Sequence, residues 1–332
     1  MEKITVIKLG ALGDVVRTLS ILPAIKEKYP ESEIHWITKK NAIQLFEDNP
    51  NIKKSYSLPY KINPIEKFDV LYNFDVEDEA TKLAQDIQAD KKFGFYAQEG
   101  FPAAFNLAGE YYLNTMFDDE IKKTNKKTYQ EMMFEVAELK WKKQTCSLYL
   151  NEKDKKYAQD FVKKFNINTK KLIGIHMGAG PRWPSKSWSQ DKIKEFIVLA
   201  NKEGYETILF CGPDEICKVD NFVNLLKKGN IQVYRNNPEN SIKEFASLVN
   251  LCKAIVCSDS FALHIALALK KPTIGMFFCT SPSEVEDYSL LKKLVSPMLN
   301  DFFPEKMDQY DERLVNSISA EQVFKVLKIL KN

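Results

Sequence analysis

The segment that decides the fold is ITVIKLGALGDVVRTLSIL, residues 4–22. It opens with the β-branched run Ile4–Ile7, continues through a glycine-containing loop, and ends with apolar residues such as Val15 and Leu19 at helical spacing. Proline breaks a helix interior, so Pro23 predicts either a kink or a second helical segment there. The segment therefore predicts a strand, a loop and a helix.

The same alternation of short apolar runs and amphipathic stretches continues along the chain. The expected strands are Glu33–Ile37, Phe68–Tyr72, Leu172–His176, Thr207–Cys211, Ala254–Cys257 and Pro272–Met276. Helices are expected to start at Ser189 and at two capping boxes, Ser241 with Glu244 and Ser319 with Gln322. Such a pattern predicts parallel sheets covered by helices on both faces. Residues 94–145 lose the pattern, and we expect loops and helices there instead of core sheet.

The length predicts two domains. A chain of 332 residues with 44% hydrophobic content is long for one compact core. We expect Rossmann-like domains over residues 1–160 and 161–318, followed by a final helix over 319–332. Two such domains in series place a ligand cleft at their interface, outside the carboxyl ends of the strands.

Composition excludes several classes of protein. With 48 Lys and Arg against 45 Asp and Glu, the net charge of +3 does not indicate a nucleic-acid partner. The start of the chain lacks the features of a signal peptide, and no run of about 18 apolar residues occurs, so we expect a cytoplasmic protein. The six cysteines form no CxxC pair and predict buried thiols. The acidic runs at 75–78 and 118–120 are interpreted as surface acidity without a metal.

The loop Gly10–Asp14 is the first candidate site. Its glycines let the backbone approach a ligand, and the amides of the following helix can hold an anion. The GxxG spacing is not the GxGxxG of dinucleotide binders, which disfavours a dehydrogenase. Asp14 is placed either to accept a proton from a substrate hydroxyl or simply to cap the helix.

The segment HMGAGPRWPSKSW, residues 176–188, is the second candidate site. It combines the glycines Gly178 and Gly180 with two cations, Arg182 and Lys186, that suit a diphosphate. The alternative is a structural loop anchored by the tryptophans.

Two further strand ends carry polar residues. In SDSFALH, residues 258–264, Ser260, His264 and the free amides of a helix start form a candidate phosphate cradle. Asp259 is either part of it or an N-cap, and His264 is either functional or a core histidine. Glu215, in the CGPDE turn, is either a ligand of ribose hydroxyls or a helix cap.

Four motifs together carry a resemblance to a known family. KLGALGDVVRTLSILPAIK, HMGAGPRWPSKSW, CGPDE and SDSFALHIALALKKPTIGMF, in this order and spacing, resemble the ADP-heptose:lipopolysaccharide heptosyltransferases, glycosyltransferase family nine, over essentially the whole chain. The resemblance implies an α/β GT-B fold, in which two Rossmann-like domains face each other across a cleft. The acceptor would bind mainly to the N-terminal domain and the sugar nucleotide to the C-terminal one. The final helix would pack back on the N-terminal domain.

The resemblance also implies a reaction. It is the inverting, metal-independent transfer of a heptose from ADP-heptose to a lipopolysaccharide core or related surface glycan. Asp14 would be the catalytic base, and Lys186 would offset charge on the diphosphate leaving group. The remaining implied site residues are Gly10, Gly13 and Arg17 for the acceptor, and Gly178, Gly180, Arg182, Ser185, Glu215, Asp259, Ser260 and His264 for the donor. No cofactor is implied, because cations and helix amides replace a metal.

Other functions stay open at this point. One alternative keeps the chemistry but uses another sugar or nucleotide as donor, or a protein or a small molecule as acceptor. The other is a protein that binds a sugar nucleotide without catalysis. The presence of both Asp14 and Lys186 favours catalysis. Phe261 stands where the family has a glycine, and its side chain would crowd a phosphate unless it turns away.

A glycolipid acceptor predicts peripheral contact with the cytoplasmic face of the inner membrane. The aromatics from Phe93 to Phe105 and a set of lysines would line the acceptor side and meet an anionic surface. The lysines are Lys39, Lys40, Lys61, Lys91, Lys92, Lys122 and Lys123. A solvated lysine-rich face is the alternative.

Overall fold

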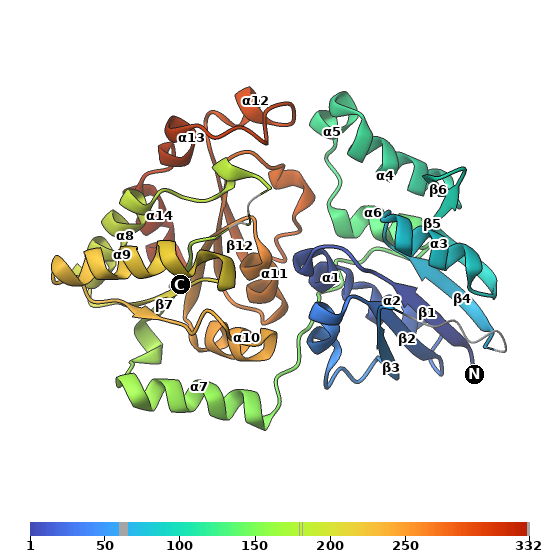
Figure 1. Ribbon diagram of the computed structural model, residues 1–332, viewed down its shortest axis with the longest axis horizontal. Coiled ribbons are helices and arrows are strands. Elements are labelled where there is room, and N and C mark those ends of the chain that lie inside the picture. Colours follow the sequence, from blue (N-terminus) through green and yellow to red (C-terminus); the bar gives the residue numbers. More distant parts are fainter. Residues whose placement is uncertain (60–65, 179, 181, 331–332) are drawn as a thin grey trace. The chain divides into compact units, whose positions relative to one another are not determined.

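The computed structural model describes residues 1–59, 66–178, 180 and 182–330. The chain divides into an N-terminal unit, Met1–Tyr149 with Ser283–Glu286, and a C-terminal unit, Leu150–Pro282 with Asp287–Asn332 (Figure 1). The boundary thus falls earlier than the expected residue 160. The reason is that helix α7, Glu152–Phe165, packs on helix α10, Ile242–Leu251, within the C-terminal unit.

The N-terminal unit is built on a six-stranded sheet in the order β3-β2-β1-β4-β5-β6. The strands are β1 Lys3–Ile7, β2 Glu33–Thr38, β3 Lys54–Ser57, β4 Phe68–Asn73, β5 Ala89–Gln98 and β6 Phe101–Ala104. All neighbours pair in parallel except β5 and β6. The strand order reverses at β1, and open α/β sheets bind ligands outside the carboxyl ends of the strands at such a point.

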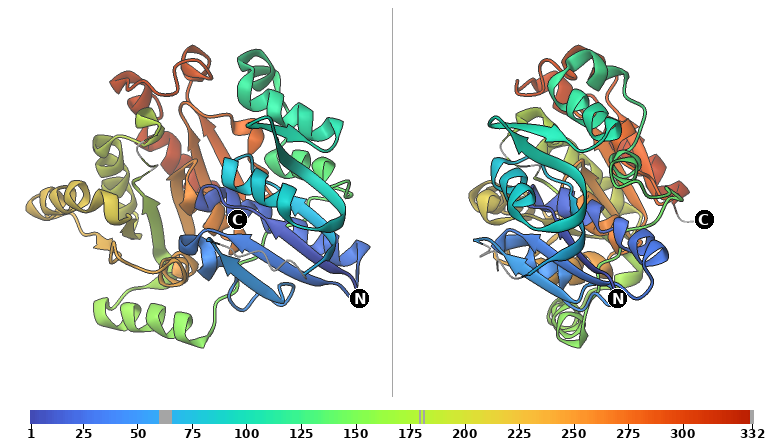
Figure 2. Two further views of the ribbon diagram at one scale, coloured as in Figure 1. Left: turned by 45° about the vertical axis from the view of Figure 1, so that its right-hand side comes forward. Right: turned by 90° about the vertical axis from the view of Figure 1, so that its right-hand side faces the viewer.

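Strands β5 and β6 contradict the expectation of no core sheet after residue 94. β5 first pairs with β4 and then runs on into an antiparallel hairpin with β6 (Figure 2). Its sequence, ADKKFGFYAQ, mixes polar and partly exposed residues. A buried parallel strand is a near-continuous apolar run, so the pattern of β5 did not indicate one.

The helices of the N-terminal unit cover this sheet. They are α1 Leu12–Thr18, α2 Ile21–Lys28, α3 Asp78–Asp86, α4 Leu107–Phe117, α5 Asp119–Thr124 and α6 Tyr129–Val136, with the 3₁₀ segment η1 at Lys40–Phe46. Pro23 lies in the first turn of α2, where a helix tolerates proline. The prediction of a second helical segment is therefore confirmed.

The C-terminal unit contains a second six-stranded sheet, all parallel, in the order β12-β11-β10-β7-β8-β9. Its strands are β7 Leu172–His176, β8 Glu206–Phe210, β9 Tyr234–Arg235, β10 Ala254–Ser258, β11 Thr273–Phe277 and β12 Leu291–Val295. Here the order reverses between β7 and β10, so the loops after these two strands meet at the switch point. The predicted α/β class with two parallel sheets is confirmed.

Helices cover both faces of the second sheet. They are α8 Gln190–Lys202, α9 Ile216–Lys228, α11 Phe261–Ala268, α12 Leu299–Phe302, α13 Glu312–Asn316 and α14 Ala320–Ile329, together with α7, α10 and the 3₁₀ segments Thr169–Lys171, η3 Pro184–Lys186, η4 Pro213–Glu215 and η5 Pro282–Glu284. Leu209 joins the core under α8 and α9, while the next residue, Phe210, contacts Phe245 of α10. Successive strand side chains point to opposite faces, so α10 covers the other one.

The final helix, α14, packs within the C-terminal unit, and its packing on the N-terminal domain stays a prediction. It packs on α8, and its Val323, Phe324 and Leu327 belong to the same buried cluster as Phe196. An amphipathic helix buries its apolar stripe wherever the nearest apolar face is, and α8 supplies that face within the same unit. The predicted capping boxes at Ser241 and Ser319 are confirmed.

All six cysteines are free, and only Cys217 is exposed, so the prediction of buried thiols holds for the other five. Over the ranges the structure describes, no helix is both long and apolar enough to cross a membrane.

Candidate functional site

The Asp14 loop lies at the switch point of the N-terminal sheet. The helix begins at Leu12, so Gly13 and Asp14 lie in its first turn, and its N-cap is Ala11, which makes no side-chain capping bond. The alternative that Asp14 is only the cap is therefore wrong. Instead, Oδ1 of Asp14 lies 2.9 Å from Nη2 of Arg17, and the Asp14 side chain is 35% exposed. The Asp14 carboxylate is thus paired with a cation and still partly open to solvent.

The Asp75 side chain binds the backbone of the glycine loop. Its Oδ2 accepts the backbone N–H groups of Leu9 and Gly10 at 2.9 and 2.7 Å, and its Oδ1 accepts that of Glu77 at 3.0 Å. Asp75 is 3% exposed, so the interpretation of this acidic run as surface charge is wrong for its first residue. The missed signal was its position: it follows β4, the neighbour of β1, directly.

Lys8 is the cation that balances Asp75. Its Nζ lies 3.3 Å from Oδ2 of Asp75 and donates to the carbonyl oxygen of Phe74 at 2.8 Å. Burial works to raise the pKa of the Asp75 carboxyl, but Lys8 and three backbone N–H groups together hold that pKa below its ordinary value. Burial works to lower the pKa of Lys8, but Tyr129 and the nearby carboxylates outweigh it, and the pKa is raised. Both groups are therefore charged at neutral pH.

The loop after β7 lies at the switch point of the C-terminal sheet. A Cβ on Gly178 would come within 1.4 Å of Oε1 of Glu215, so any side chain at this position would displace the carboxylate. Gly180 has a φ of +74°, which also favours glycine. Oε2 of Glu215 accepts a hydrogen bond from the N–H of Gly212 at 3.0 Å. Glu215 therefore makes a capping contact, as one of its two predicted roles required. Ala179 and Pro181 of this motif lie outside the described residues.

His176 joins this loop to the start of α11. Its Nδ1 lies 3.4 Å from the Ser260 hydroxyl oxygen. Burial lowers the pKa of His176, although the carboxylate of Glu215 opposes the shift. His176 therefore contacts one predicted donor ligand, Ser260, and feels the charge of another, Glu215.

Lys186, Asp259 and His264 come together beside His176. Nζ of Lys186 lies 3.1 Å from Oδ2 of Asp259, and Nε2 of His264 lies 3.9 Å from Oδ1 of the same carboxylate. The N-cap of α11 is Ser260, so the alternative that Asp259 is the N-cap is wrong. The cluster sits at the amino end of α11, where free amides favour anions.

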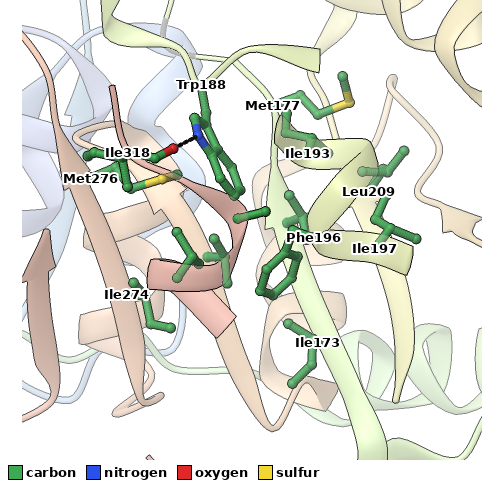
Figure 3. Close-up of a cluster of buried hydrophobic side chains, with 14 of the residues drawn as sticks. Ile173, Met177, Trp188, Ile193, Phe196, Ile197, Leu209, Ile274, Met276 and Ile318 are labelled. Atoms are coloured by element: carbon green, nitrogen blue, oxygen red, sulfur yellow. Dashed lines mark hydrogen bonds between the residues drawn. The ribbon is translucent and has the colours of Figure 1, made fainter. Parts of the chain in front are cut away.

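Two neighbours of Lys186 anchor its loop. Trp188 is 4% exposed and its Nε1 donates to the carbonyl oxygen of Ile318 at 3.0 Å (Figure 3). Ser185 is fully buried; its hydroxyl donates to Gln309 and accepts from the N–H of Asp311. The prediction that Ser185 binds the donor is therefore wrong, because its hydroxyl is committed to the backbone. Arg182 is exposed, with its guanidinium 4.6 Å from the Trp183 ring centre.

Phe261 turns toward α10. Its ring stacks on that of Phe245 with 5.8 Å between centroids and 25° between planes. Phe245 also contacts the ring of His176 edge-on, at 6.2 Å. The side chain at the family's glycine position is thus packed against an aromatic group.

Metal ligands do not gather in the part of the chain that the structure describes: no group of three or more His, Cys, Asp or Glu side chains is placed to hold an ion.

Comparisons with known proteins agree with this geometry. A family model described as glycosyltransferase family 9 (heptosyltransferase) matches residues 67–308. The chain is 24% identical over 351 residues to lipopolysaccharide heptosyltransferase 1 of Campylobacter coli, an alignment that covers 99% of this chain and 98% of the relative. The crystal structure of a glycosyl transferase family 9 protein from Veillonella parvula superposes with a TM-score of 0.78 and 19% identity, covering 99% and 97% of the two chains. The structure of E. coli ADP-heptose lps heptosyltransferase II superposes with a TM-score of 0.71 and 17% identity, covering 99% of this chain and 98% of the other.

Two parallel-sheet units with these structural neighbours define a glycosyltransferase of the GT-B fold. The chain belongs to glycosyltransferase family 9, the heptosyltransferase family. The matched range contains the candidate donor residues of the C-terminal unit but not the Asp14 loop.

Proposed function

We propose that the protein is an inverting, metal-independent transferase that moves a heptose from ADP-heptose to a lipopolysaccharide core or related surface glycan. The observation that carries the proposal is the Asp14 carboxylate, paired with Arg17 at 2.9 Å and 35% exposed at the switch point of its sheet. The family and its lipopolysaccharide-modifying members support the substrate class.

The chemistry needs a base and a stabilised leaving group. Asp14 accepts the proton of the acceptor hydroxyl as its oxygen attacks the anomeric carbon from the face opposite the diphosphate. The bond from that carbon to the diphosphate oxygen breaks, and ADP leaves. Lys186 and the amides at the start of α11 offset the charge that develops on the diphosphate, which is the role a metal ion fills in other transferases.

The donor site is proposed to span the cluster from Glu215 to Lys186. Glu215 suits ribose hydroxyls, Lys186 the diphosphate, and Asp259 with His264 the sugar side. The stacking holds the Phe261 ring against Phe245 of α10, which supports a phosphate at the amino end of α11. Gly10 and Gly13 are proposed for the acceptor side.

We also propose peripheral membrane contact through the N-terminal unit. Three large apolar side chains in β6 and α4 are mostly exposed to solvent: Phe101 at 75%, Leu107 at 80% and Phe117 at 70%. Several of the lysines expected to help have local partners: Lys39 pairs with Glu77, Lys92 donates to carbonyls at the end of α3, and Lys122 pairs with Asp119. Lys61 lies outside the described residues. Apolar insertion is therefore the main expected contribution, and a triple serine variant of the three apolar residues should lose binding to anionic vesicles.

The function is tested by product formation. Purified protein is incubated with ADP-heptose and a heptose-free lipopolysaccharide core, and ADP release and the core's mass are followed. Gain of one heptose with EDTA present supports the proposal. A thermal-shift panel of ADP, UDP and GDP tests the nucleotide, because a true ligand stabilises the native state. Transfer only from another nucleotide sugar, or only with added metal, would contradict it.

A further inference from the structure

The Arg17 guanidinium is enclosed by its own unit. Nη2 lies 2.9 Å from Oδ1 of Asp14, one turn earlier on α1. The guanidinium carbon lies 3.7 Å from the centre of the Tyr129 ring, on α6. The Arg17 side chain is only 14% exposed, and its Nε is buried. The Asp14 carboxylate and the Tyr129 ring therefore already occupy much of the guanidinium surface that a substrate carboxylate or phosphate would need.

A chain of hydroxyls fixes Tyr129 below Arg17. The Thr18 hydroxyl donates to the carbonyl oxygen of Asp14 at 2.6 Å, and it lies 2.8 Å from the Tyr129 hydroxyl. Since the Thr18 proton is used on Asp14, the Tyr129 hydroxyl donates to Thr18. Tyr129 is 1% exposed. The buried, hydrogen-bonded Tyr129 ring therefore packs against the Arg17 guanidinium and supports it.

Charges from several elements face the Asp14 and Arg17 pair. Burial works to lower the pKa of Arg17, but Asp14, with smaller contributions from Tyr129, Tyr112 and Glu284, raises it. Lys8, at the end of β1, also interacts with Asp14, and Asp75 balances Lys8 in turn. Arg17 contacts the Asp14 carboxylate directly, with Nη2 2.9 Å from Oδ1.

We propose that Arg17, supported by Tyr129, is a positioning residue that keeps Asp14 ionised and in one orientation, and that it is not a ligand of the acceptor. This inference rests on the proposed role of Asp14 as the base. It replaces the acceptor-binding role that the sequence had indicated for Arg17. Arg17 acts through Asp14, so its loss should change the catalytic step and its pH dependence, and leave acceptor binding alone.

The test is Arg17→Gln, with Arg17→Lys as a second variant that keeps the charge. Transfer from ADP-heptose to a heptose-free lipopolysaccharide core is measured over roughly pH 5 to 9, the range in which ionisation of a carboxylate base changes kcat. For Arg17→Gln we expect kcat to fall about 10- to 100-fold, acceptor KM to stay within about twofold, and the acid limb of kcat to move up by about one pH unit. Arg17→Lys should retain the wild-type acid limb, and added guanidinium should restore part of the activity of Arg17→Gln.

A rise in acceptor KM at unchanged kcat would overturn the inference, since that is the signature of a lost ligand. Loss of activity in both variants with an unshifted acid limb and no guanidinium rescue would also overturn it, because the role would then be structural. Tyr129→Phe keeps the ring but loses the hydrogen bond to Thr18, so it should shift the profile less than Tyr129→Leu, which should shift it as Arg17→Gln does.

A parallel Asp14→Asn measurement separates this inference from the proposed function. If Asp14→Asn turns over normally, the base assignment fails. If Asp14→Asn is inactive but Arg17→Gln changes only KM, the base stands and the positioning role fails.

Discussion

Asp75→Asn should destabilise the N-terminal unit strongly. The substitution keeps the shape but removes the charge that balances Lys8, whose side chain is 6% exposed. Removing one partner of a buried ion pair costs about 3–5 kcal/mol. The new amide must also turn an NH₂ either toward the N–H groups of Leu9 and Gly10 or toward that of Glu77, so at least one donor loses its acceptor. We expect a loss of about 3–5 kcal/mol in the free energy of unfolding of this unit.

Lys8→Met provides the matched comparison. It leaves Asp75 with three backbone N–H donors, whereas Asp75→Asn leaves Lys8 with the carbonyl oxygen of Phe74. Lys8→Met should therefore cost less, about 2 kcal/mol. Urea unfolding followed by circular dichroism measures both, and hydrogen exchange at Leu9 and Gly10 reports the loop directly. A loss below about 1 kcal/mol for Asp75→Asn, or a larger loss for Lys8→Met, would refute the reasoning.

Three further predictions concern the C-terminal unit. Gly178→Ala would displace the Glu215 carboxylate, because the new Cβ would lie 1.4 Å from Oε1, so the thermal shift produced by ADP should decrease; a normal shift would show that the position of this carboxylate does not matter for nucleotide binding. Lys186→Met should lower kcat about 100-fold with little change in acceptor KM, and an unchanged kcat would rule out its role at the leaving group. Burial lowers the folded-state pKa of His176 below the ordinary 6.5, so the unfolded state takes up more protons and stability falls as the pH drops below that value. His176→Gln should make the melting temperature less dependent on pH over roughly pH 5 to 7, a range around the ordinary pKa of histidine. An identical pH dependence in wild type and variant would contradict the lowered pKa of His176.

The sequence predicted the strands that are buried on both faces, because each is a continuous β-branched or apolar run, such as Ile4–Ile7 and Ala254–Cys257. It also placed Lys186 and Asp259 in two separate candidate sites, and the structure brings these two side chains together, because the loops after neighbouring parallel strands share an edge of the sheet. Strands near the sheet edge, such as β5, were missed because their polar residues hide the pattern.

The sequence could not predict which polar side chains are already used in hydrogen bonds within the fold. Ser185 looks like a ligand in a glycine-rich loop, but its hydroxyl is used by backbone groups more than 100 residues away, at Gln309 and Asp311. Asp75 looks like surface charge until β4 is known to lie beside β1. Both depend on contacts distant in the chain, which local pattern does not encode.

The central claim is that Asp14 is the base, and Asp14→Asn tests it most directly. The variant keeps the size of the side chain but cannot take the proton. With ADP-heptose and a heptose-free lipopolysaccharide core, we predict that turnover falls at least about 100-fold while the thermal shift produced by ADP stays at the wild-type value. Turnover within about threefold of wild type, well short of what loss of a general base produces, would contradict the claim.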